Sequence, residues 1–512
     1  MGTLSQKVYL QPDMPTDTDS VSDQERIRQA LQQLGYAPVT FPLPVLRTLY
    51  PLCREASFAI TVTLVWRETD WVVTAVEPGD RRQHHYGLAV DYGSTTIVMQ
   101  LVDLCSGTVI AEEKAVNGQT AFGTDILTRI TFAMEDPSHA DALHQATAET
   151  LSRLLAQLTD VSGIDAANCS IMVLSGNTTM IHFLLKLNAW TVFAAPFAPV
   201  CADPGFFWGE ELGLDFSGIV HIIPAASNYI GGDIISGLLA LDLHHQEEVS
   251  LFFDIGTNGE LVIGNREWML AGAGAAGPAL EGYISRYGMR AADGAIDRVR
   301  IRDGKLRFTT IANQKPVGIC GSGIIDLMAQ MLLSGWINMA GQLQPQASER
   351  IVYLPQEMQY AAVYATSEES ATGEPLYFSQ TDIAQYLDTK AAAYTMVECL
   401  LETAGVEISE LAHFYLSGAF PVHSDLESAI TIGIFPDLPR QRYCCVRNSS
   451  LDGARILLLD RSRLREAREL AENMYCVQFA SVPDFLVRMQ GAKFIPHTDI
   501  NRFPTIRQRL KA

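Results

Sequence analysis

Two aspartates, Asp91 and Asp254, each follow a short apolar run and are followed in turn by a stretch rich in glycine and hydroxyl groups. The first stretch holds Gly93, Ser94, Thr95 and Thr96, and the second holds Gly256, Thr257, Asn258 and Gly259. A second apolar run comes next in both copies, and in the later copy it opens with Glu260. A strand, a carboxylate, a flexible turn and a returning strand are therefore predicted twice.

This pattern is suited to binding phosphate. Glycine lets the backbone turn sharply beside a ligand, and successive N–H groups of a turn form a concavity for anions. The hydroxyls of Thr95, Thr96 and Thr257 would bind a terminal phosphate. A carboxylate at the strand end can hold Mg²⁺ through water, because this ion keeps several waters and uses few carboxylates. One such hairpin is equally typical of an ordinary tight turn. Two copies predict magnesium and a nucleotide held between Asp91 and Asp254.

Two further segments could contact the nucleotide. Gly418 and Ala419 follow an apolar run, and small residues there would leave room for a base and a ribose; the alternative is a plain connection from strand to helix. Gly321, Ser322 and Gly323 open an apolar helix, whose N–H groups could bind an anion. Close packing of that helix on a strand is the alternative.

Four weaker candidates remain. Gly277 lies before a proline near a helix start and either lines the nucleotide or permits close packing. Lys390 lies on a predicted helix and either contacts the ribose or base or is solvated. Asp233 either orients the attacking water or caps a helix. Ser175 follows an apolar run and could face the same cleft.

The elements that position these residues alternate between strand and helix patterns, which predicts the α/β class. We expect a mobile N-terminal arm over residues 1–24, because residues 11–23 are polar. A small α/β module is expected over 25–82, beginning at a capping box at Ser22. The repeated hairpins place one lobe at 83–245 and a second at 246–512.

The composition argues against several classes of function. The net charge of −21 argues against binding of nucleic acid through its phosphates. No run of apolar residues is long enough to span a membrane, and the first residues have no signal-peptide pattern, so we expect a cytoplasmic protein without membrane contact. The nine cysteines include no Cys-x-x-Cys pair, which argues against zinc or iron–sulfur ligation in this chain.

The two phosphate segments and the segment at Gly418 resemble, in order, the phosphate and adenosine motifs of the actin, heat-shock-chaperone and sugar-kinase ATPase superfamily. The resemblance is closest to the ATP-dependent reductive activators of corrinoid proteins, and it covers most of the chain. It is carried by the segments 254–260, 275–282, 288–292 and 318–323. It implies a duplicated, actin-like, two-lobed ATPase fold that resembles ribonuclease H in each lobe, with residues 25–82 similar to the family's middle domain.

The sequence departs from that family at its N-terminus. Family members carry a ferredoxin-like domain with an iron–sulfur cluster there, whereas the first 85 residues of this chain hold one cysteine, Cys53. An electron would therefore come from a separate ferredoxin-like donor. The stretch before residue 275 lacks the usual serine, and the adenosine segment reads Ser-Gly-Ala instead of containing two adjacent glycines. The resemblance also implies a homodimer.

The predicted function follows from this resemblance. The chain is expected to bind and hydrolyse ATP and to couple it to reductive reactivation of a corrinoid (cobalamin) methyl-carrier protein in a methyltransferase system. Asp254 or Glu260 would position the attacking water, and Asp91 would share the magnesium ion. A kinase of a small hydroxylated metabolite and a non-enzymatic, ATP-dependent assembly protein are the alternatives.

Overall fold

The computed structural model describes residues 2–256, 258–274, 282, 284–418 and 424–511, and the chain divides into two compact units. Unit 1 contains residues 1–242 and 449–474, and unit 2 contains 243–448 and 475–512. The boundary expected after residue 245 lies after 242 instead. The return of residues 449–474 to unit 1 was not predicted, because the helix pattern of this stretch does not indicate which unit it packs on.

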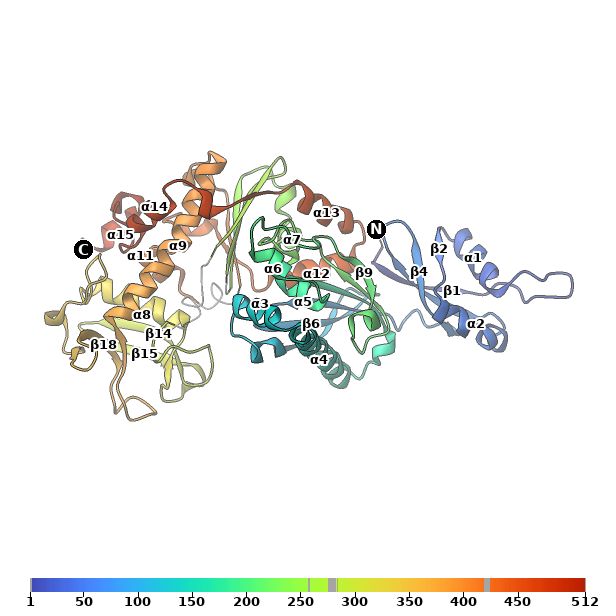
Figure 1. Ribbon diagram of the computed structural model, residues 1–512, viewed down its shortest axis with the longest axis horizontal. Coiled ribbons are helices and arrows are strands. Elements are labelled where there is room, and N and C mark those ends of the chain that lie inside the picture. Colours follow the sequence, from blue (N-terminus) through green and yellow to red (C-terminus); the bar gives the residue numbers. More distant parts are fainter. Residues whose placement is uncertain (1, 257, 275–281, 283, 419–423, 512) are drawn as a thin grey trace. The chain divides into compact units, whose positions relative to one another are not determined.

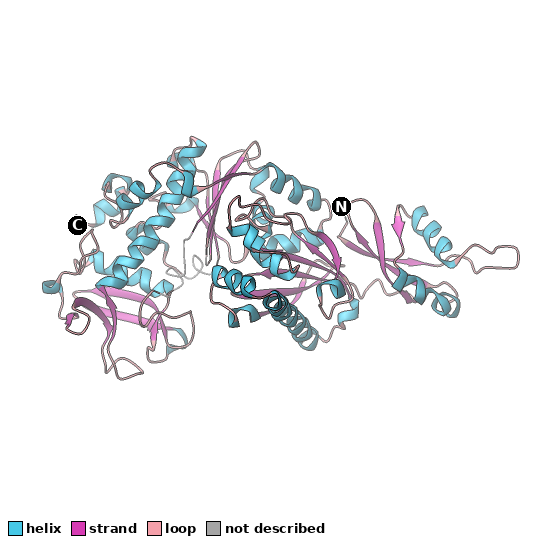
Figure 2. Ribbon diagram, viewed as in Figure 1, coloured by secondary structure: helices cyan, strands magenta, loops and turns pink. Residues whose placement is uncertain are grey.

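An N-terminal domain begins unit 1 and consists of a four-stranded sheet with two helices (Figures 1 and 2). The strands lie in the order β1-β3-β4-β2. Its elements are β1 (Ser5–Leu10), α1 (Asp23–Gln33), β2 (Val39–Thr40), α2 (Leu43–Glu55), β3 (Ile60–Trp66) and β4 (Trp71–Pro78). Ser22 caps α1 by accepting a hydrogen bond from the backbone N–H of Glu25, as the capping box predicts.

The prediction of a mobile arm over residues 1–24 is wrong for its first part. Residues 5–10 form β1, which pairs antiparallel with β3. Val8 and Leu10 are buried in the core of the domain, and this gain in apolar burial offsets the loss of chain entropy. The Ser5 hydroxyl also lies 3.0 Å from His85 Nε2 and 2.7 Å from the Ser170 hydroxyl. The strand is therefore attached to the rest of unit 1.

The larger sheet of unit 1 has six strands in the order β7-β6-β5-β8-β10-β9. Its strands are β5 (Tyr86–Tyr92), β6 (Thr96–Asp103), β7 (Val109–Val116), β8 (Cys169–Gly176), β9 (Gly205–Trp208) and β10 (Ile219–Ile222). Helix α4 packs on β6 and β7 and contacts α3, while α12 packs on β5 and β8 and contacts α7 (Figure 1). The helices are α3 (Ile126–Glu135), α4 (Pro137–Ser162), α5 (Thr178–Leu184), α6 (Trp190–Phe193), α7 (Gly232–Leu241), α12 (Ser449–Leu459) and α13 (Arg463–Asn473).

Unit 2 is also built on a six-stranded sheet, in the order β21-β20-β11-β12-β13-β22. Its strands are β11 (Ser250–Ile255), β12 (Gly259–Gly264), β13 (Met269–Gly274), β20 (Phe414–Ser417), β21 (Tyr443–Cys445) and β22 (Tyr475–Val477). Two three-stranded sheets contain β14 (Ala295–Arg302), β15 (Lys305–Thr310), β16 (Gly318–Ile319), β17 (Ile351–Leu354), β18 (Gln359–Ala365) and β19 (Leu376–Ser379). The helices are α8 (Gly321–Leu333), α9 (Gln380–Ala404), α11 (Leu426–Ile432), α14 (Phe485–Ala492) and α15 (Pro504–Arg509).

Five strands of each large sheet share one topology. In each, an antiparallel hairpin (β5–β6 or β11–β12) is extended on one side by an antiparallel strand, β7 or β13. On the other side its first strand pairs in parallel with β8 or β20, which is followed by a further parallel strand, β10 or β21. The predicted α/β class and internal duplication are therefore confirmed. No helix in the described part of the chain combines the length and hydropathy that a bilayer crossing needs.

Buried histidines make stability depend on pH, and His221 on β10 is the clearest case. Its side chain is 3% exposed, and its ring lies 4.4 Å from the ring of Phe206. Burial lowers the pKa of His221 from 6.5 to about 3. The unfolded chain takes up a proton near pH 6.5 that the folded chain does not bind until about pH 3. The stability that the neutral His221 contributes is therefore fully present above pH 6.5, and it is lost as the pH falls from 6.5 toward 3.

We predict that His221→Phe, which keeps the aromatic contact without a titrating group, loses less stability on acidification than the wild type. The difference between pH 7 and pH 5 is expected to be about 2 kcal/mol. Urea unfolding followed at both pH values measures it. His84→Phe, at an exposed position, is the matched control and is expected to keep the wild-type pH dependence. An equal loss in His221→Phe and the wild type would contradict the prediction.

Candidate functional site

The first phosphate segment lies at one end of the large sheet in unit 1. Asp91 is on β5, and residues 93–95 form the turn to β6. Gly93 cannot carry a side chain without a shift, because a Cβ there would lie 2.5 Å from the carbonyl oxygen of Thr96. Ser94 and Thr95 are partly exposed and Thr96 is exposed. The structure therefore brings the predicted carboxylate, glycine and hydroxyls of this segment together at one end of the β5–β6 hairpin.

Two side chains that the sequence analysis missed hold this turn in place. The Asn117 side chain donates to the Gly93 carbonyl at 2.9 Å, and its backbone N–H donates to the Thr95 carbonyl at 2.9 Å. Arg129 on α3 is fully buried, and its Nη1 donates to the Ser94 carbonyl at 2.6 Å. Burial lowers the pKa of Arg129, yet a guanidinium stays charged in proteins. A fixed positive charge therefore lies directly behind the turn, where it favours an anion in front.

Strand ends of the same sheet add a second group of polar side chains. Ser175 is opposite Asp91 in the parallel pairing of β8 with β5. The Ser450 hydroxyl, in the first turn of α12, lies 2.9 Å from Asp91 Oδ1 and 2.9 Å from the Ser175 hydroxyl. Ser175 itself donates to the Gly232 carbonyl at 3.1 Å. Because a carboxylate is the stronger acceptor, Ser450 donates to Asp91 and fixes its orientation.

Asp233 is the second carboxylate of this group. It lies in the first turn of α7, whose N-cap is Gly231, so Asp233 is not the N-cap residue, although its side chain binds an N–H of the first turn. Its Oδ1 accepts from the N–H of Ile234 at 3.0 Å. Burial, and then the charge of Asp91, raise the pKa of Asp233 to about 7. Close approach of the α7 start requires Gly231, where a Cβ would lie 2.5 Å from the Cα of Asn177.

The second phosphate segment lies at the matching position in unit 2. Asp254 on β11 is opposite Glu260 on β12, so the two carboxylates share a face of the hairpin. In the turn, the backbone N–H of Gly256 donates to the Asn258 carbonyl at 2.9 Å, and Gly259 begins β12. Thr257 lies outside the described residues, as do Gly277 and Ala419.

Each aspartate has the same neighbour on the adjacent parallel strand, a Ser-Gly pair. Ser175 is opposite Asp91, and Ser417 is opposite Asp254. The following glycines approach the backbone closely. A Cβ at Gly176 would lie 2.9 Å from the Tyr92 carbonyl oxygen, and one at Gly418 would lie 2.2 Å from that of Ile255 and 3.2 Å from Asp254 Oδ1. The sequence signal was the triplet Leu-Ser-Gly at 174–176 and at 416–418, which the sequence analysis did not connect.

The helix start at Gly321, Ser322 and Gly323 is buried. Close packing accounts for Gly323, because a Cβ there would lie 2.3 Å from the carbonyl oxygen of Ile296 on β14. A nucleotide contact by Gly321 or Ser322 stays a prediction.

The interpretation of Lys390 as a nucleotide contact needs correction. Its side chain is fully buried in α9, and its ammonium donates to the carbonyls of Ala492, Phe494 and Pro496 at 2.5, 2.7 and 2.5 Å. Burial lowers the pKa of Lys390, whereas three acceptors favour the ammonium, since a neutral amine has only two N–H groups. All three donors are used, so none is left for a ribose or a base. Helical spacing alone did not reveal this burial.

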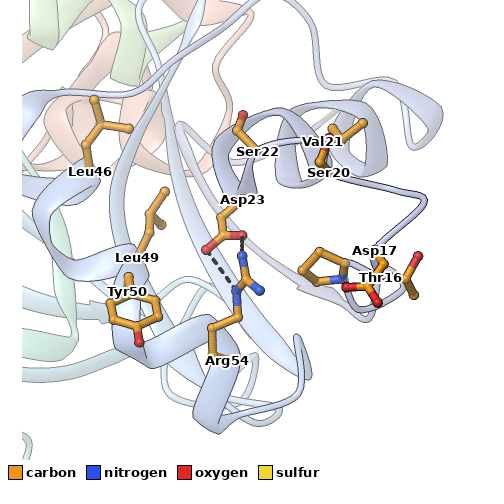
Figure 3. Close-up of a pocket in the computed structure, with 11 residues that line it drawn as sticks. Thr16, Asp17, Ser20, Val21, Ser22, Asp23, Leu46, Leu49, Tyr50 and Arg54 are labelled. Atoms are coloured by element: carbon orange, nitrogen blue, oxygen red, sulfur yellow. Dashed lines mark hydrogen bonds and ion pairs between the residues drawn. The ribbon is translucent and has the colours of Figure 1, made fainter.

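A hollow of about 670 Å³ lies in the N-terminal domain, where it is lined by α2 and by the segment that leads into α1 (Figure 3). Arg54 is the basic residue in its lining, and its guanidinium is bound by both oxygens of Asp23, at 2.6 and 3.2 Å. The basic side chain in this hollow is therefore already paired and does not provide a free positive charge for a nucleotide. We assign the candidate site to the strand ends instead.

Models of known protein families match almost the whole chain. Residues 248–507 match a family model described as the C-terminal domain of RACo, the ASKHA domain. Residues 86–246 match the RACo middle region and residues 1–83 the RACo linker region. The term middle domain, which the sequence analysis applied to 25–82, thus belongs to the following segment.

Individual relatives are similar over most of their length. The chain is 29% identical to "Corrinoid activation enzyme RamQ" of Eubacterium limosum, over 81% of this chain and 71% of that protein. It is 24% identical to "[Co(II) methylated amine-specific corrinoid protein] reductase" of Methanosarcina barkeri, over 76% and 73%. A solved structure, "Reductive activator for corrinoid,iron-sulfur protein", aligns with a TM-score of 0.88 and 34% identity over 98% of this chain and 81% of that one. The predicted actin-like fold and resemblance are confirmed.

We predict that Ser450→Ala weakens binding of magnesium-ATP about tenfold, because it removes a hydrogen bond to a charged acceptor. Ser450→Thr keeps the hydroxyl and is expected to bind within about twofold of the wild type. Calorimetric titration with ATP and Mg²⁺ measures both. Equal loss in the two variants would show that volume at this position matters and the hydroxyl does not.

We predict that Gly418→Ala lowers ATP affinity at least tenfold. Its φ of +102° strains a side chain, and its Cβ would push the end of β11 away. The control is Gly405→Ala, at a φ of +66° with no atom within 4 Å of the new Cβ. That variant is expected to lose about 1 kcal/mol of stability and no affinity. The same calorimetric affinity for Gly418→Ala and the wild type would contradict the role of the close approach.

Proposed function

The chain belongs to the RACo family, and from this we propose that it is an ATP-dependent activator that drives reductive reactivation of a corrinoid protein. The observation that carries the proposal is the match over 98% of the chain to a solved reductive activator. Two relatives whose names specify corrinoid activation or corrinoid protein reduction agree with it.

We propose that Asp91 and Asp254 would hold one Mg²⁺ through water, and that the ion would neutralise negative charge on the phosphates of ATP. Both are carboxylates at strand ends with hydroxyl neighbours, Ser450 and Ser175 for Asp91 and Ser417 for Asp254. Such a donor set fits an ion that prefers oxygen and keeps its waters. Phosphoryl transfer needs position and electrostatic stabilisation more than covalent help.

Carboxylates of the second phosphate segment and of α7 are proposed to position the attacking water. Asp254 and Glu260 share one face of the β11–β12 hairpin in unit 2. In unit 1, Asp233 has its pKa raised to about 7 by burial and by Asp91, which suits a group that accepts a proton near neutral pH. The hydroxyls of Thr95, Thr96 and Thr257 would bind the γ-phosphate.

A conformational switch can supply free energy for an unfavourable electron transfer. Reversing a two-state equilibrium from 1:99 to 99:1 takes about 5.5 kcal/mol. At about 59 mV per tenfold change for one electron, this corresponds to roughly 240 mV. A conformational equilibrium of this size would allow a donor to reduce Co(II) to Co(I) against an unfavourable potential difference.

The electron is proposed to come from a separate ferredoxin-like protein. Cys53, in the N-terminal domain, is fully buried, and burial raises the pKa of its thiol to about 11. It therefore behaves as an apolar core residue and not as a cluster ligand. A homodimer is proposed from the family resemblance.

The test is a slow ATPase that accelerates when a corrinoid protein with oxidised cobalt is added. Purified corrinoid methyl-carrier proteins in the Co(II) state serve as the panel, and phosphate release and the cobalt absorption spectrum are followed together. Stimulation by one member and formation of Co(I) with a reduced ferredoxin are expected. ATP binding without stimulation by any member would contradict the proposal.

We predict that Asp254→Asn lowers the stimulated ATPase at least 100-fold, because the amide removes the negative charge that would hold the magnesium waters. Phosphate release under saturating ATP measures the effect. Asp160→Asn, on the exposed side of α4, is the matched control and should retain full activity. Wild-type activity in Asp254→Asn would exclude this aspartate from the site.

A further inference from the structure

Unit 2 carries a strongly basic segment in an otherwise acidic protein. Residues 286–315 contain eight basic and three acidic side chains, whereas the whole chain has a net charge of −21. The strands β14 and β15 form a hairpin in this segment, connected by a turn at Asp303 and Gly304, both of which have positive φ. The basic residues are therefore concentrated on one short element.

The two faces of the hairpin differ sharply. Val299, Ile301 and Leu306 lie in the main apolar core of unit 2, and Phe308 packs against it. The opposite face carries Arg298, Arg302, Lys305 and Arg307, which we call the basic face. Arg302, Lys305 and Arg307 are exposed, and Arg298 is half-buried.

The basic face forms no ion pair within the described residues, although Asp297 and Asp303 lie on the same hairpin. In contrast, Arg300 on β14 binds Asp326 at 2.8 Å and Asp425 at 2.6 Å. Arg302 is directly opposite Lys305, and Arg300 is directly opposite Arg307. Like charges at opposite positions destabilise a sheet, so the pattern does not serve the stability of the hairpin. Such a pattern is typical of a surface that binds an oppositely charged partner.

Arg300 connects this hairpin to both helices that begin near the predicted nucleotide segments of unit 2. Asp326 is a fully buried residue of α8, the helix that starts at Gly321. It also accepts the Val299 backbone N–H at 3.2 Å, so α8 packs on β14 beyond the short pairing of that strand with β16. Asp425 is the N-cap of α11, seven residues after Gly418. A displacement of the hairpin would therefore be transmitted to both helices, α8 and α11.

We propose that the basic face docks onto a carboxylate-rich face of the corrinoid protein. This rests on the proposed function, which requires a partner whose binding is coupled to ATP, and Arg300 provides that connection. The occupant is a protein, because a chain with a net charge of −21 repels nucleic acids and anionic membranes beyond this small face. An acidic protein surface can instead match four charges at sheet spacing.

The test compares R302E/K305E with the wild type. The two residues are directly opposite, and the double variant again places like charges there, so the hairpin keeps its native level of repulsion. Binding of the Co(II) corrinoid protein that stimulates the wild-type ATPase is measured with ATP at low and high salt. We expect at least tenfold weaker binding at low salt, a smaller salt dependence, and unchanged ATPase without partner. R47E/R153E changes the net charge equally at exposed positions on α2 and α4 and should bind within about twofold of the wild type.

A chemical test locates the contact. Carbodiimide joins an amine to a carboxylate in direct contact, so Lys305 should be cross-linked to the corrinoid protein in the wild type. K305R keeps the charge and should keep the affinity while losing this cross-link.

Three outcomes would overturn the docking proposal alone: unchanged affinity and salt dependence in R302E/K305E, a loss restricted to the electron donor, or a loss restricted to self-association of this chain. Failure of every corrinoid protein to bind the wild type would instead overturn the proposed function and the docking proposal together.

Discussion

The close approach of a glycine to the backbone beside each motif aspartate is the constraint on which the rest of the site depends. In unit 1 the glycine is Gly176 against the carbonyl of Tyr92, and in unit 2 it is Gly418 against that of Ile255. The residue before each glycine is a serine at the register of the aspartate. A parallel strand can therefore end beside the carboxylate without a side chain in between, which leaves the strand ends open to a ligand.

Side chains from other elements bind the phosphate turn, Asp91 and the neighbouring helices, and hold them in position. Arg129 and Asn117 bind three successive carbonyls of the first phosphate turn, and Ser450 binds Asp91. In unit 2, Arg300 binds carboxylates on α8 and α11. These groups act through position and charge. A site that gains its catalytic power from electrostatic stabilisation needs such rigid support, because each donor must already be in place before the reaction.

The parts of the site that could be predicted from sequence are those carried by local signals. The Asp-x-Gly turns depend on a glycine and hydroxyls within a few residues, so both were found, as was the fold they belong to. Ser450 was missed because it is brought to Asp91 by the tertiary fold from 359 positions away. Lys390 was misinterpreted because the sequence does not show that its helix face is covered by residues 492–496. The first strand was taken for an arm because its pairing partner, β3, lies far along the chain.

The course of residues 449–474 has a consequence for biosynthesis. These residues belong to the compact unit of the N-terminal half, where α12 covers β5, β8 and α7, and Gly453 leaves no room for a Cβ beside the Ser236 carbonyl. Synthesis proceeds from the N-terminus. The face of the sheet that α12 covers, and the side of α7 that α12 contacts, therefore stay exposed while residues 243–448 are translated. The first half of the protein therefore completes its folding only after most of the chain has been synthesised.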